Sequence, residues 1–595
     1  MKKPSAGLAL SALVALTAIS FSACGKSSQA SLTIALVNAP ATLTINQSVN
    51  LTASVSNDSS NAGVDWTCSS ASGDCGTFAP AHTASGGTSV FTAPATAGTV
   101  TITAAATADG SVKAMANISV VPIGSNAMLN GRYVFSVQGL DTNGSYTAAG
   151  TIIADGNGNI TGGEQDYTDL SLNAGPDAVS GSYSIGPDGL GSVTLNVNDT
   201  SLPHNGVETF SIAVTSATHA LVIQFDGSAT SSGSLDSQAD SAVDPAAISG
   251  AFAFTVQGAD RVNYVPVSYG GVIVLSALSG TVASGTYFVN DGGSTYSASL
   301  SGSMTAPDSY GRGTLAFTIG LDLSYYAVQG QVLRLVGKNS PYMMSGGSMF
   351  GQGTAGANAT FSKASLTGDY VLFEGGETLA GTLALAGQFS ADGAGNFGAG
   401  VADVNNGGTT TFSSIAGQAI YTMAGDGSGT VALPATVDTV GYISSLVIFA
   451  VDPAINLLDP TSASGGGGAL VMDYDSNAVA TGCIVPRSTG AFDGNYALNM
   501  QFISSSGESD WAGQTVAASG GLTGRVDINA SGSTTAGESL SGTFTADAAN
   551  VGRWTGSFTV GGTTYLISYY QVSPTLFIIV DMDSAEVGIG IMQTE

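Results

Sequence analysis

The residue types that most often carry out catalysis or bind metals are scarce in this chain and lie far apart. Histidine occurs at three of 595 positions, His82, His204 and His219, and no two of them have the spacing of metal ligands. Serine–histidine–aspartate catalysis needs a base held beside its nucleophile, and no local motif supplies one. His219 directly precedes an apolar strand, where we expect an ordinary turn or edge residue. These residues predict no catalytic site and no bound cofactor.

Paired carboxylates are the remaining route to acid–base chemistry, as in glycoside hydrolysis. On a strand, two residues that lie two positions apart share one face. We expect that face to be exposed to solvent here. A degradative surface enzyme that uses Glu164 and Asp166 remains an alternative hypothesis. The local pairs are Glu164 and Asp166, Glu374 and Glu377, and Glu508 and Asp510.

One loop has the composition of a weak calcium site. Asp155, Asn157 and Asn159 place oxygen-bearing side chains alternately with glycines, as calcium loops do. The bidentate glutamate of such loops is missing at the usual spacing, because Glu164 follows Asp155 by only nine residues. A tight hairpin turn explains the same residues, since Asp-Gly favours the positive φ angles of such turns. Similar stretches at 188–191, 391–396 and 426–429 favour the turn. We therefore predict no metal site and keep this loop only as a weak calcium candidate.

Two tyrosine pairs offer a platform on which a sugar ring would stack. They are Tyr325–Tyr326 and Tyr569–Tyr570. Consecutive residues on a strand point to opposite faces, so one ring of each pair should pack in a core and the other should face outward.

Four cysteines divide into three roles. Cys68 and Cys75 bracket a short loop and predict a disulfide in an exported protein, whereas a metal site there would have only His82 nearby. Cys483 is left without an evident partner and is expected to be a structural thiol or, alternatively, to form an intermolecular bridge. Cys24 belongs to the N-terminal segment.

Composition indicates the elements that must position these residues. Glycine occupies 82 positions, charged residues make up 9% and hydrophobic residues 43%. The chain can therefore bury sizeable cores, and long helical patterns are absent. A net charge of −29 excludes the basic surface needed to bind nucleic acid and the polybasic segment that binds anionic lipid. A β-rich extracytoplasmic protein remains.

The N-terminus has the layout of an export signal. Lys2 and Lys3 precede an apolar stretch at 6–19, and Phe21-Ser22-Ala23-Cys24 follows. This arrangement resembles the lipobox of bacterial lipoproteins, although Phe21 stands where leucine is usual. The resemblance implies a signal peptide at 1–23, acylation of Cys24, a linker at 24–30 and a membrane anchor. Gly25 in place of aspartate favours the outer membrane, on the surface or facing the periplasm. An ordinary secretory signal is the alternative.

Residues 31–122 predict one β-sandwich, because five segments alternate with period two. The residues Val64-Asp65-Trp66, the stretch FTAP at 91–94 and the stretch TVTITA at 99–104 resemble bacterial Ig-like domains of the adhesin type (group 2-like). The resemblance implies that Trp66 lies between the two sheets.

The remainder of the chain repeats itself four times. The motifs LNGRYVF, ISGAFAF, LTGDYVL and FDGNYAL begin at residues 129, 248, 366 and 492, and two further elements recur in the same order. Short alternating strands and tight turns predict antiparallel domains, either small barrels or sandwiches. The expected domains span 129–245, 246–363, 364–488 and 490–595, joined by short linkers like beads on a string. Similar repeats occur in uncharacterised envelope lipoproteins.

These patterns favour an all-β, non-enzymatic envelope lipoprotein with a role in adhesion, structure, or binding of a glycan or protein. A carrier of small apolar ligands inside the barrels is the alternative. Barrels filled by Phe135, Phe254 and their equivalents would leave no cavity for such a ligand.

Overall fold

The computed structural model describes residues 31–594, apart from positions 38, 41, 72, 122–123, 339–342, 354–359, 416–419, 435–436, 438–442 and 463. The predicted signal peptide, Cys24 and the linker 24–30 lie outside the described residues. Strands dominate, and the helices of the described part are short 3-10 turns: η1 (Asn126–Met128), η2 (Pro203–Gly206), η3 (Asp240–Val243) and η4 (Lys363–Ser365). None of these helices is long and apolar enough to cross a membrane.

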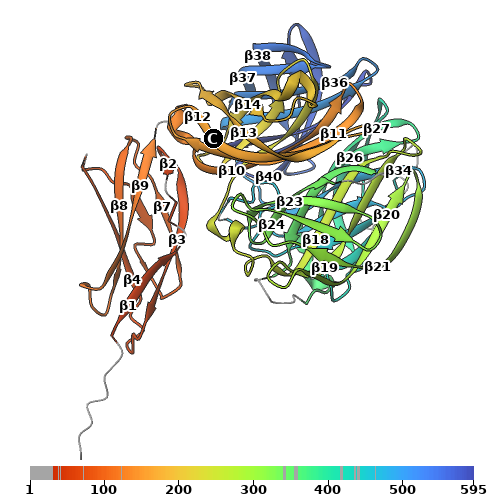
Figure 1. Cartoon of the computed structure of the whole chain (residues 1–595). Coiled ribbons are helices and arrows are strands. Elements are labelled where there is room, and N and C mark those ends of the chain that lie inside the picture. The colour runs from red at the N-terminus through yellow and green to blue at the C-terminus, as the bar shows by residue number, and fades with distance from the viewer. Residues whose placement is uncertain are drawn as a thin grey trace, which may run out of the picture.

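The N-terminal strands form two sheets around one core, beside the rest of the molecule (Figure 1). Trp66 lies in this core and its ring stacks on Phe78 at 5.8 Å. Cys68 and Cys75 are joined by a disulfide. One sheet has the order β1 (Thr33–Val37), β3 (Ser48–Ser56), β7 (Thr88–Thr92), β5 (Thr77–Ala79), and the other β2 (Thr42–Thr44), β9 (Lys113–Val121), β8 (Gly98–Ala106), β4 (Val64–Ser70), β6 (His82–Thr83).

Three of the four sequence repeats fold as closed, eight-stranded antiparallel barrels, which decides between the barrel and the sandwich. Repeat 1 contains β10 (Asn130–Asp141), β11 (Gly144–Asp155), β12 (Asn159–Asp169), β13 (Asn173–Ile185), β14 (Leu190–Val197), β15 (Val207–Val214), β16 (His219–Gln224) and β17 (Ala229–Ser237). Repeat 2 contains β18 (Ser249–Asp260), β19 (Pro266–Ser276), β20 (Thr281–Asp291), β21 (Ser294–Met304), β22 (Arg312–Phe317), β23 (Asp322–Gln329), β24 (Val332–Gly337) and β25 (Met343–Gly351). Repeat 4 contains β35 (Gly494–Ser504), β36 (Gly507–Ala518), β37 (Gly521–Ala530), β38 (Ser533–Ala546), β39 (Arg553–Val560), β40 (Thr563–Ser573), β41 (Leu576–Asp581) and β42 (Glu586–Thr594).

Repeat 3 follows the same meander as a nine-stranded sheet, because its fourth strand is divided. The two edge strands, β29 and β30, follow one another in the chain, and Asn396 forms an isolated bridge with Ile420. Its strands are β26 (Thr367–Thr378), β27 (Gly381–Asp392), β28 (Phe397–Asn406), β29 (Thr409–Ser414), β30 (Ile420–Tyr421), β31 (Ser428–Ala432), β32 (Ser445–Ala450), β33 (Ala469–Asp473) and β34 (Ala478–Pro486).

The repeated opening motif has a backbone and a packing role. Its glycine has φ between 107° and 125° in every copy, a region that favours glycine because a β-carbon clashes there. The aromatic side chain two residues later is buried in the core of its own repeat. The glycines are Gly131, Gly250, Gly368 and Gly494, and the aromatics are Tyr133, Phe252, Tyr370 and Tyr496.

The four repeats do not hang as separate beads, because they pack side by side in a closed ring. Strand β11 of repeat 1 contacts β24 and β25 of repeat 2, and β18 and β19 of repeat 2 contact β33 and β34 of repeat 3. Strand β27 of repeat 3 contacts β41 and β42 of repeat 4, and β36 of repeat 4 returns to β15, β16 and β17 of repeat 1. Each repeat therefore places its first strands against the last strands of the next.

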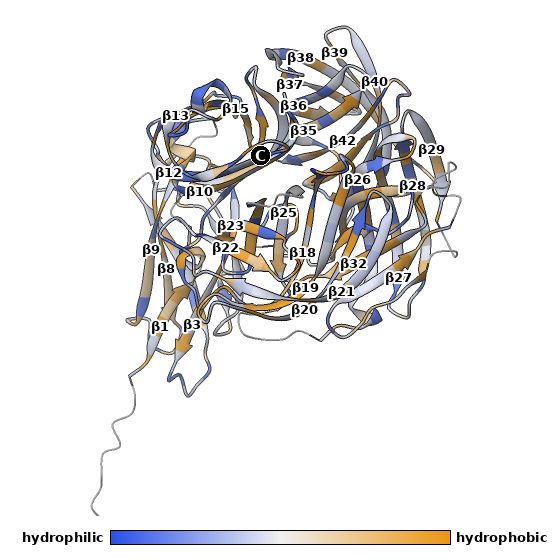
Figure 2. Cartoon of the chain, turned by 45° about the vertical axis from the view of Figure 1, so that its right-hand side comes forward, coloured by the Kyte–Doolittle hydropathy of each residue, from blue (hydrophilic) through white to orange (hydrophobic). Residues whose placement is uncertain are grey.

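An apolar core between the repeats holds this ring together. It includes side chains from all four repeats, among them Val134, Tyr326, Val447 and Ile578. Figure 2 shows hydrophobic stretches along the strands that meet there, such as β18 and β32. The first and last strands of each repeat are consequently buried on both faces, which a single barrel in water would not require.

An asparagine fixes three of the four junctions. Asn290, Asn405 and Asn529 are buried, and each side-chain amide donates to three backbone carbonyls in the last turn of the next repeat. At the fourth junction, Thr168 of repeat 1 stands near this position and accepts a hydrogen bond from Arg261 of repeat 2. These bonds satisfy buried carbonyls that would otherwise be unpaired.

Two of the junctions each contain a buried ion pair. Asp166 on β12 accepts hydrogen bonds from Arg312 Nε at 2.5 Å and from the Tyr326 hydroxyl at 2.8 Å, both in repeat 2. Asp403 on β28 accepts from Arg553 Nε at 2.6 Å and from the Tyr570 hydroxyl at 2.7 Å in repeat 4. In repeat 2 the same register position holds Phe288, which packs against Phe449 with ring centroids 5.7 Å apart.

We expect Asp166→Ala to destabilise the ring by about 3–5 kcal/mol, because it leaves the Arg312 guanidinium and the Tyr326 hydroxyl buried without their acceptor. Urea unfolding of the full chain measures the loss. Asp188→Ala is the matched control, since its pair with Arg525 spans 3.9 Å between exposed side chains, and we expect about 0–1 kcal/mol there. Equal losses in the two variants would contradict a structural role for the buried pair.

Candidate functional site

One loop of repeat 3 contacts the other three repeats at the centre of the ring. We call residues 451–468, between β32 and β33, the central loop. The backbone carbonyl of Pro460 accepts from Gln329 of repeat 2, and the Thr461 hydroxyl donates to Thr218 of repeat 1. Asp459 accepts from Gln593 Nε2 of repeat 4 at 3.1 Å. The glycines at 465, 467 and 468 have positive φ and let the loop return to β33.

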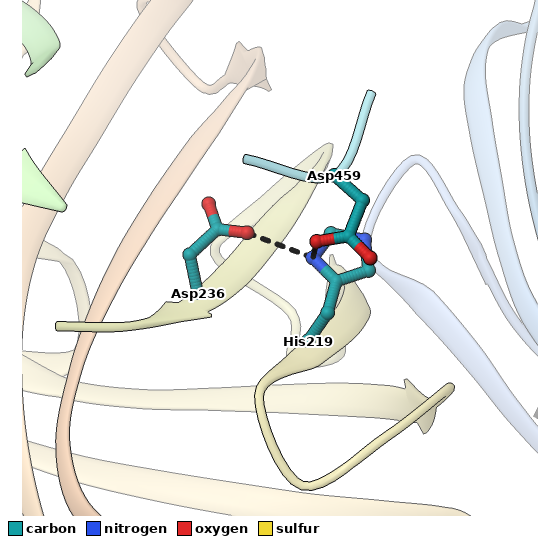
Figure 3. Close-up of side chains that lie close together, drawn as sticks. All are labelled: His219, Asp236 and Asp459. Carbon is teal, nitrogen blue, oxygen red and sulfur yellow. Dashed lines mark hydrogen bonds and ion pairs between the residues drawn. The ribbon is translucent and has the colours of Figure 1, made fainter. Parts of the chain in front are cut away.

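Beneath this loop lies a buried cluster of ionisable side chains. His219 Nδ1 lies 2.7 Å from Asp236 Oδ1 and 3.9 Å from Asp459 Oδ1. Figure 3 shows His219 and Asp236 on neighbouring strands of repeat 1, with Asp459 approaching from the central loop. Arg334 of repeat 2 lies 2.6 Å from the other oxygen of Asp236. The His219 and Asp236 side chains are 1% and 0% exposed.

Mutual attraction keeps this cluster charged. Burial by itself opposes a charged imidazole, but Asp459 and Asp236 outweigh it and raise the pKa of His219. Burial also opposes the Asp236 carboxylate, but Arg334 and His219 outweigh it and hold the pKa of Asp236 well below its usual range. The shifts therefore favour the protonated form of His219 and the ionised form of Asp236.

This geometry supports an ionic latch better than catalysis or metal binding. His219, Asp236 and Asp459 each offer a ligand atom, and these atoms lie within 4.8 Å of one another. A divalent cation would, however, meet the Arg334 guanidinium that already binds Asp236. The histidine–aspartate pair of a hydrolase needs an accessible ring nitrogen. His219 Nε2 is buried and has no hydrogen-bond partner among the described residues.

The predicted edge position of His219 is wrong, since its side chain is buried where three repeats meet. The sequence carried one usable signal for this cluster. A charged residue, Arg334, interrupts an otherwise apolar strand between Leu333 and Leu335. A charge within a buried strand requires a partner, but only the fold shows that the partner comes from another repeat.

The expectation that the carboxylate pairs face solvent is confirmed for Glu377, which is exposed, but is wrong for four of the six residues. Asp166 is buried in the junction with repeat 2, while Glu374 lies inside repeat 3 and is 0% exposed. Burial raises the pKa of Glu374 to about 8. Glu508 and Asp510 are buried where repeat 4 meets repeat 1, and Asp510 accepts from Ser232 Oγ at 2.7 Å. Burial raises the pKa of Asp510 to about 7.

The tyrosine pairs do not form an exposed platform. Tyr325 and Tyr569 point into the cores of their repeats, as predicted. Tyr326 and Tyr570 point outward from their barrels, but the neighbouring repeat covers them, and all four rings are 0% exposed. The free Cys483 packs against the core between the repeats, and burial raises the pKa of its thiol to about 12.

The weak calcium loop has the hydrogen bonds of a turn. Asp155 Oδ1 accepts from the backbone amides of Asn157 at 2.7 Å and Asn159 at 3.0 Å, and Asp155 Oδ2 accepts from the Asn159 side chain. Hydrogen bonds from Asn159 and from Asn157 lower the pKa of Asp155 to about 2. Asp392 makes the same pattern in repeat 3, with Asn396 as its side-chain partner.

Comparison with known proteins leaves the chain without an assigned family. No family model matches it, and no curated protein does. A DUF3598-family protein of unknown function from Nostoc punctiforme is 10% identical, with a TM-score of 0.13, over 37% of this chain and 95% of its own. Transferrin binding protein B from Neisseria meningitidis is 8% identical, with a TM-score of 0.17, over 68% and 84%. The alcaligin receptor FauA from Bordetella pertussis is 10% identical, with a TM-score of 0.12, over 83% and 81%. No functional argument rests on likenesses this distant.

The latch predicts a pH-dependent contribution to stability. Because the pKa of His219 is raised on folding, its contribution is complete at low pH and is lost as pH rises through the folded-state value. We expect His219→Gln to lower the free energy of unfolding by about 3–5 kcal/mol at pH 6 and by less at pH 9, measured by urea titration at both values.

His82→Gln is the matched control, because His82 pairs with Asp65 on the exposed surface of the two-sheet unit. Its loss should stay at about 0–1 kcal/mol. An equal loss for His219→Gln at pH 6 and pH 9 would contradict a latch that depends on the protonation of the His219 imidazole in this pH range. A zinc-dependent rise in Tm that the variant lacks would replace the latch with a metal site.

Proposed function

We propose that this protein is a non-enzymatic cell-envelope lipoprotein that presents a rigid ring of four β-repeats for adhesion or for binding a glycan or protein. The acylated Cys24 would tether it to the outer membrane, and the two-sheet unit, as an Ig-like module, would stand between the tether and the ring. The Ig-like assignment is supported by Trp66 in a core shared by two sheets.

The observation that carries this proposal is that the ring buries most of its clustered ionisable side chains away from the outer surface. The ionisable cluster around His219 is sealed under the central loop, and the buried carboxylates lie in junctions or cores. The described outer surface is instead formed by strands such as β21 and β38, whose first halves are mostly exposed. Binding at that surface needs no opening of the ring.

The carrier hypothesis finds less support in the interiors. A cavity inside repeat 1 has a volume of about 20 Å³, which is room for roughly one water molecule. Pockets for small organic ligands measure about 300–1,000 Å³. Large aromatic rings fill the other cores, including Phe254, Phe389 and Phe577. The cavity is lined by Phe135, Ile152, Val193, Leu195, Phe210, Ile212, Val222 and Leu235.

Protease treatment of intact cells tests the location and the tether. We expect the wild-type chain to be lost from intact cells, because a surface lipoprotein is accessible. We expect the Cys24→Ser variant to leave the membrane fraction, because it has no acyl chains. Immunoblotting of cells and membrane fractions measures both results, with a periplasmic protein as the control for intact outer membranes.

Two outcomes would contradict the proposal. Protection of the wild-type chain until the outer membrane is opened would exclude surface exposure and favour partners in the periplasm. Membrane retention of Cys24→Ser would show that acylation of Cys24 is not the anchor.

A further inference from the structure

The barrel wall of repeat 2 is open beside the first half of β21. Strand β21 pairs with β20 along its whole length, from Asp291↔Ser294 to Thr281↔Ser303. It pairs with β22 only at Gly302, Ser303 and Met304. Residues 294–299 are exposed, although alternate side chains on a barrel strand should point inward. A ligand can therefore approach inward-facing side chains from the side of this barrel.

Three tyrosines line this opening. Tyr269, Tyr287 and Tyr296 lie on the neighbouring strands β19, β20 and β21. The rings of Tyr269 and Tyr287 are stacked at 6.3 Å, and Tyr296 meets Tyr287 edge to face at 6.0 Å. Tyr287 is buried, Tyr269 is half-buried and Tyr296 is 50% exposed. The rings thus form a continuous path from the core to the surface, which we call the tyrosine opening.

A fixed loop at the same end of the barrel presents a fourth tyrosine. The loop between β18 and β19 is held to repeat 1 by Arg261, whose guanidinium donates to the Thr168 hydroxyl and to the carbonyls of Asp169 and Leu172. Tyr264 in this loop is 73% exposed and has a φ of 57°, which a residue with a β-carbon rarely adopts. Such an exposed ring in a disfavoured backbone conformation is typical of a functional position.

Two carboxylates lie near the rings. Asp291 ends β20 directly before the turn to β21, and one of its oxygens has no hydrogen-bond donor among the described residues. Burial, and then the charge of Asp260, raise the pKa of Asp291. Asp260 itself is held by the backbone amide of Val262 and the side chain of Asn263. One oxygen of Asp291 is therefore a hydrogen-bond acceptor that a ligand hydroxyl could use.

The first half of the fourth strand is also unpaired on this side in repeats 1 and 4, because β14 pairs with β13 only from Val179 and β39 pairs with β38 only from Leu540, but other groups pack at this end. In repeat 1, Asn198 of a longer connection donates its backbone amide to Ala178 on β13, and Leu202 is buried there. In repeat 4, the rings of Phe502, Trp511 and Tyr565 pack within 5.3 Å of one another, and Trp511 is 2% exposed. Repeat 2 differs because two exposed tyrosines, Tyr264 and Tyr296, stand at this end.

We propose that the tyrosine opening of repeat 2 binds an uncharged oligosaccharide, a proposal that rests on the surface-binding function above. The apolar face of a sugar ring stacks on aromatic side chains, while phenolic hydroxyls and carboxylates exchange hydrogen bonds with sugar hydroxyls. The net charge of −29 disfavours anionic saccharides. An extended peptide that pairs with the free edge of β21 is the competing occupant.

Isothermal titration calorimetry of the full chain tests this site. The probes are unbranched hexasaccharides of glucose, xylose and N-acetylglucosamine, and a lysine-containing decapeptide stands for the competing occupant. We expect at least one saccharide to bind, Tyr296→Ala to weaken its binding at least tenfold, and Tyr296→Phe to stay within threefold of wild type because it keeps the ring. Leu278→Ala is the control, since Leu278 is 72% exposed at the opposite end of the same barrel.

Three results would overturn the proposal. Binding of none of the saccharides to the wild-type chain would exclude this ligand class. Binding that survives both Tyr296→Ala and Tyr264→Ala would place the saccharide elsewhere on the surface, and the proposed function would stand without this site. Binding of the decapeptide alone, lost in Tyr296→Ala, would assign the opening to a peptide partner. The protease experiment on intact cells is independent of all three.

Discussion

Burial of the outer barrel faces between neighbouring repeats is the constraint on which the rest of this structure depends. Because every junction joins the first strands of one repeat to the last strands of the next, the fourth repeat must fit the first for the ring to close. Residues that would face water in a single barrel, such as Val134 and Tyr326, then form a second core. Their burial supplies the hydrophobic stabilisation that holds the three closed barrels and the nine-stranded sheet of repeat 3 together.

The same burial dictates how the few basic residues are used. A chain with 13 lysines and arginines has little capacity for ion pairs, yet Arg312, Arg334 and Arg553 all lie between repeats, where each binds an aspartate. Planar guanidinium groups suit such sites because they satisfy several acceptors at once. Buried carboxyl groups without a basic partner, such as Glu374, instead have a raised pKa. The polar groups of the junctions thereby specify which faces meet.

Rigidity and surface chemistry follow from this arrangement. The central loop and the latch under it join all four repeats at one place, so the repeats are fixed relative to one another. A fixed set of outer strands suits a binding platform, because little conformational freedom is lost when a ligand binds. Within that set, repeat 2 is distinguished by the exposed rings of Tyr264 and Tyr296 beside the unpaired first half of β21.

The sequence by itself determined the all-β class, the four copies and the turns. These depend on local alternation, on the repeated Gly-x-aromatic motif, and on glycines such as Gly131, which take positive φ angles that other residues rarely adopt. It also predicted that one tyrosine of each adjacent pair lies in a core, which is confirmed for Tyr325 and Tyr569. Only the tertiary structure decided what covers the outer faces, since alternation distinguishes the two faces of a strand but carries no information about a neighbouring repeat. For that reason Asp166, expected at the surface, is buried against Tyr326, and His219, whose nearest partner Asp236 lies in its own repeat, also meets Asp459 from a repeat more than two hundred residues away in the chain.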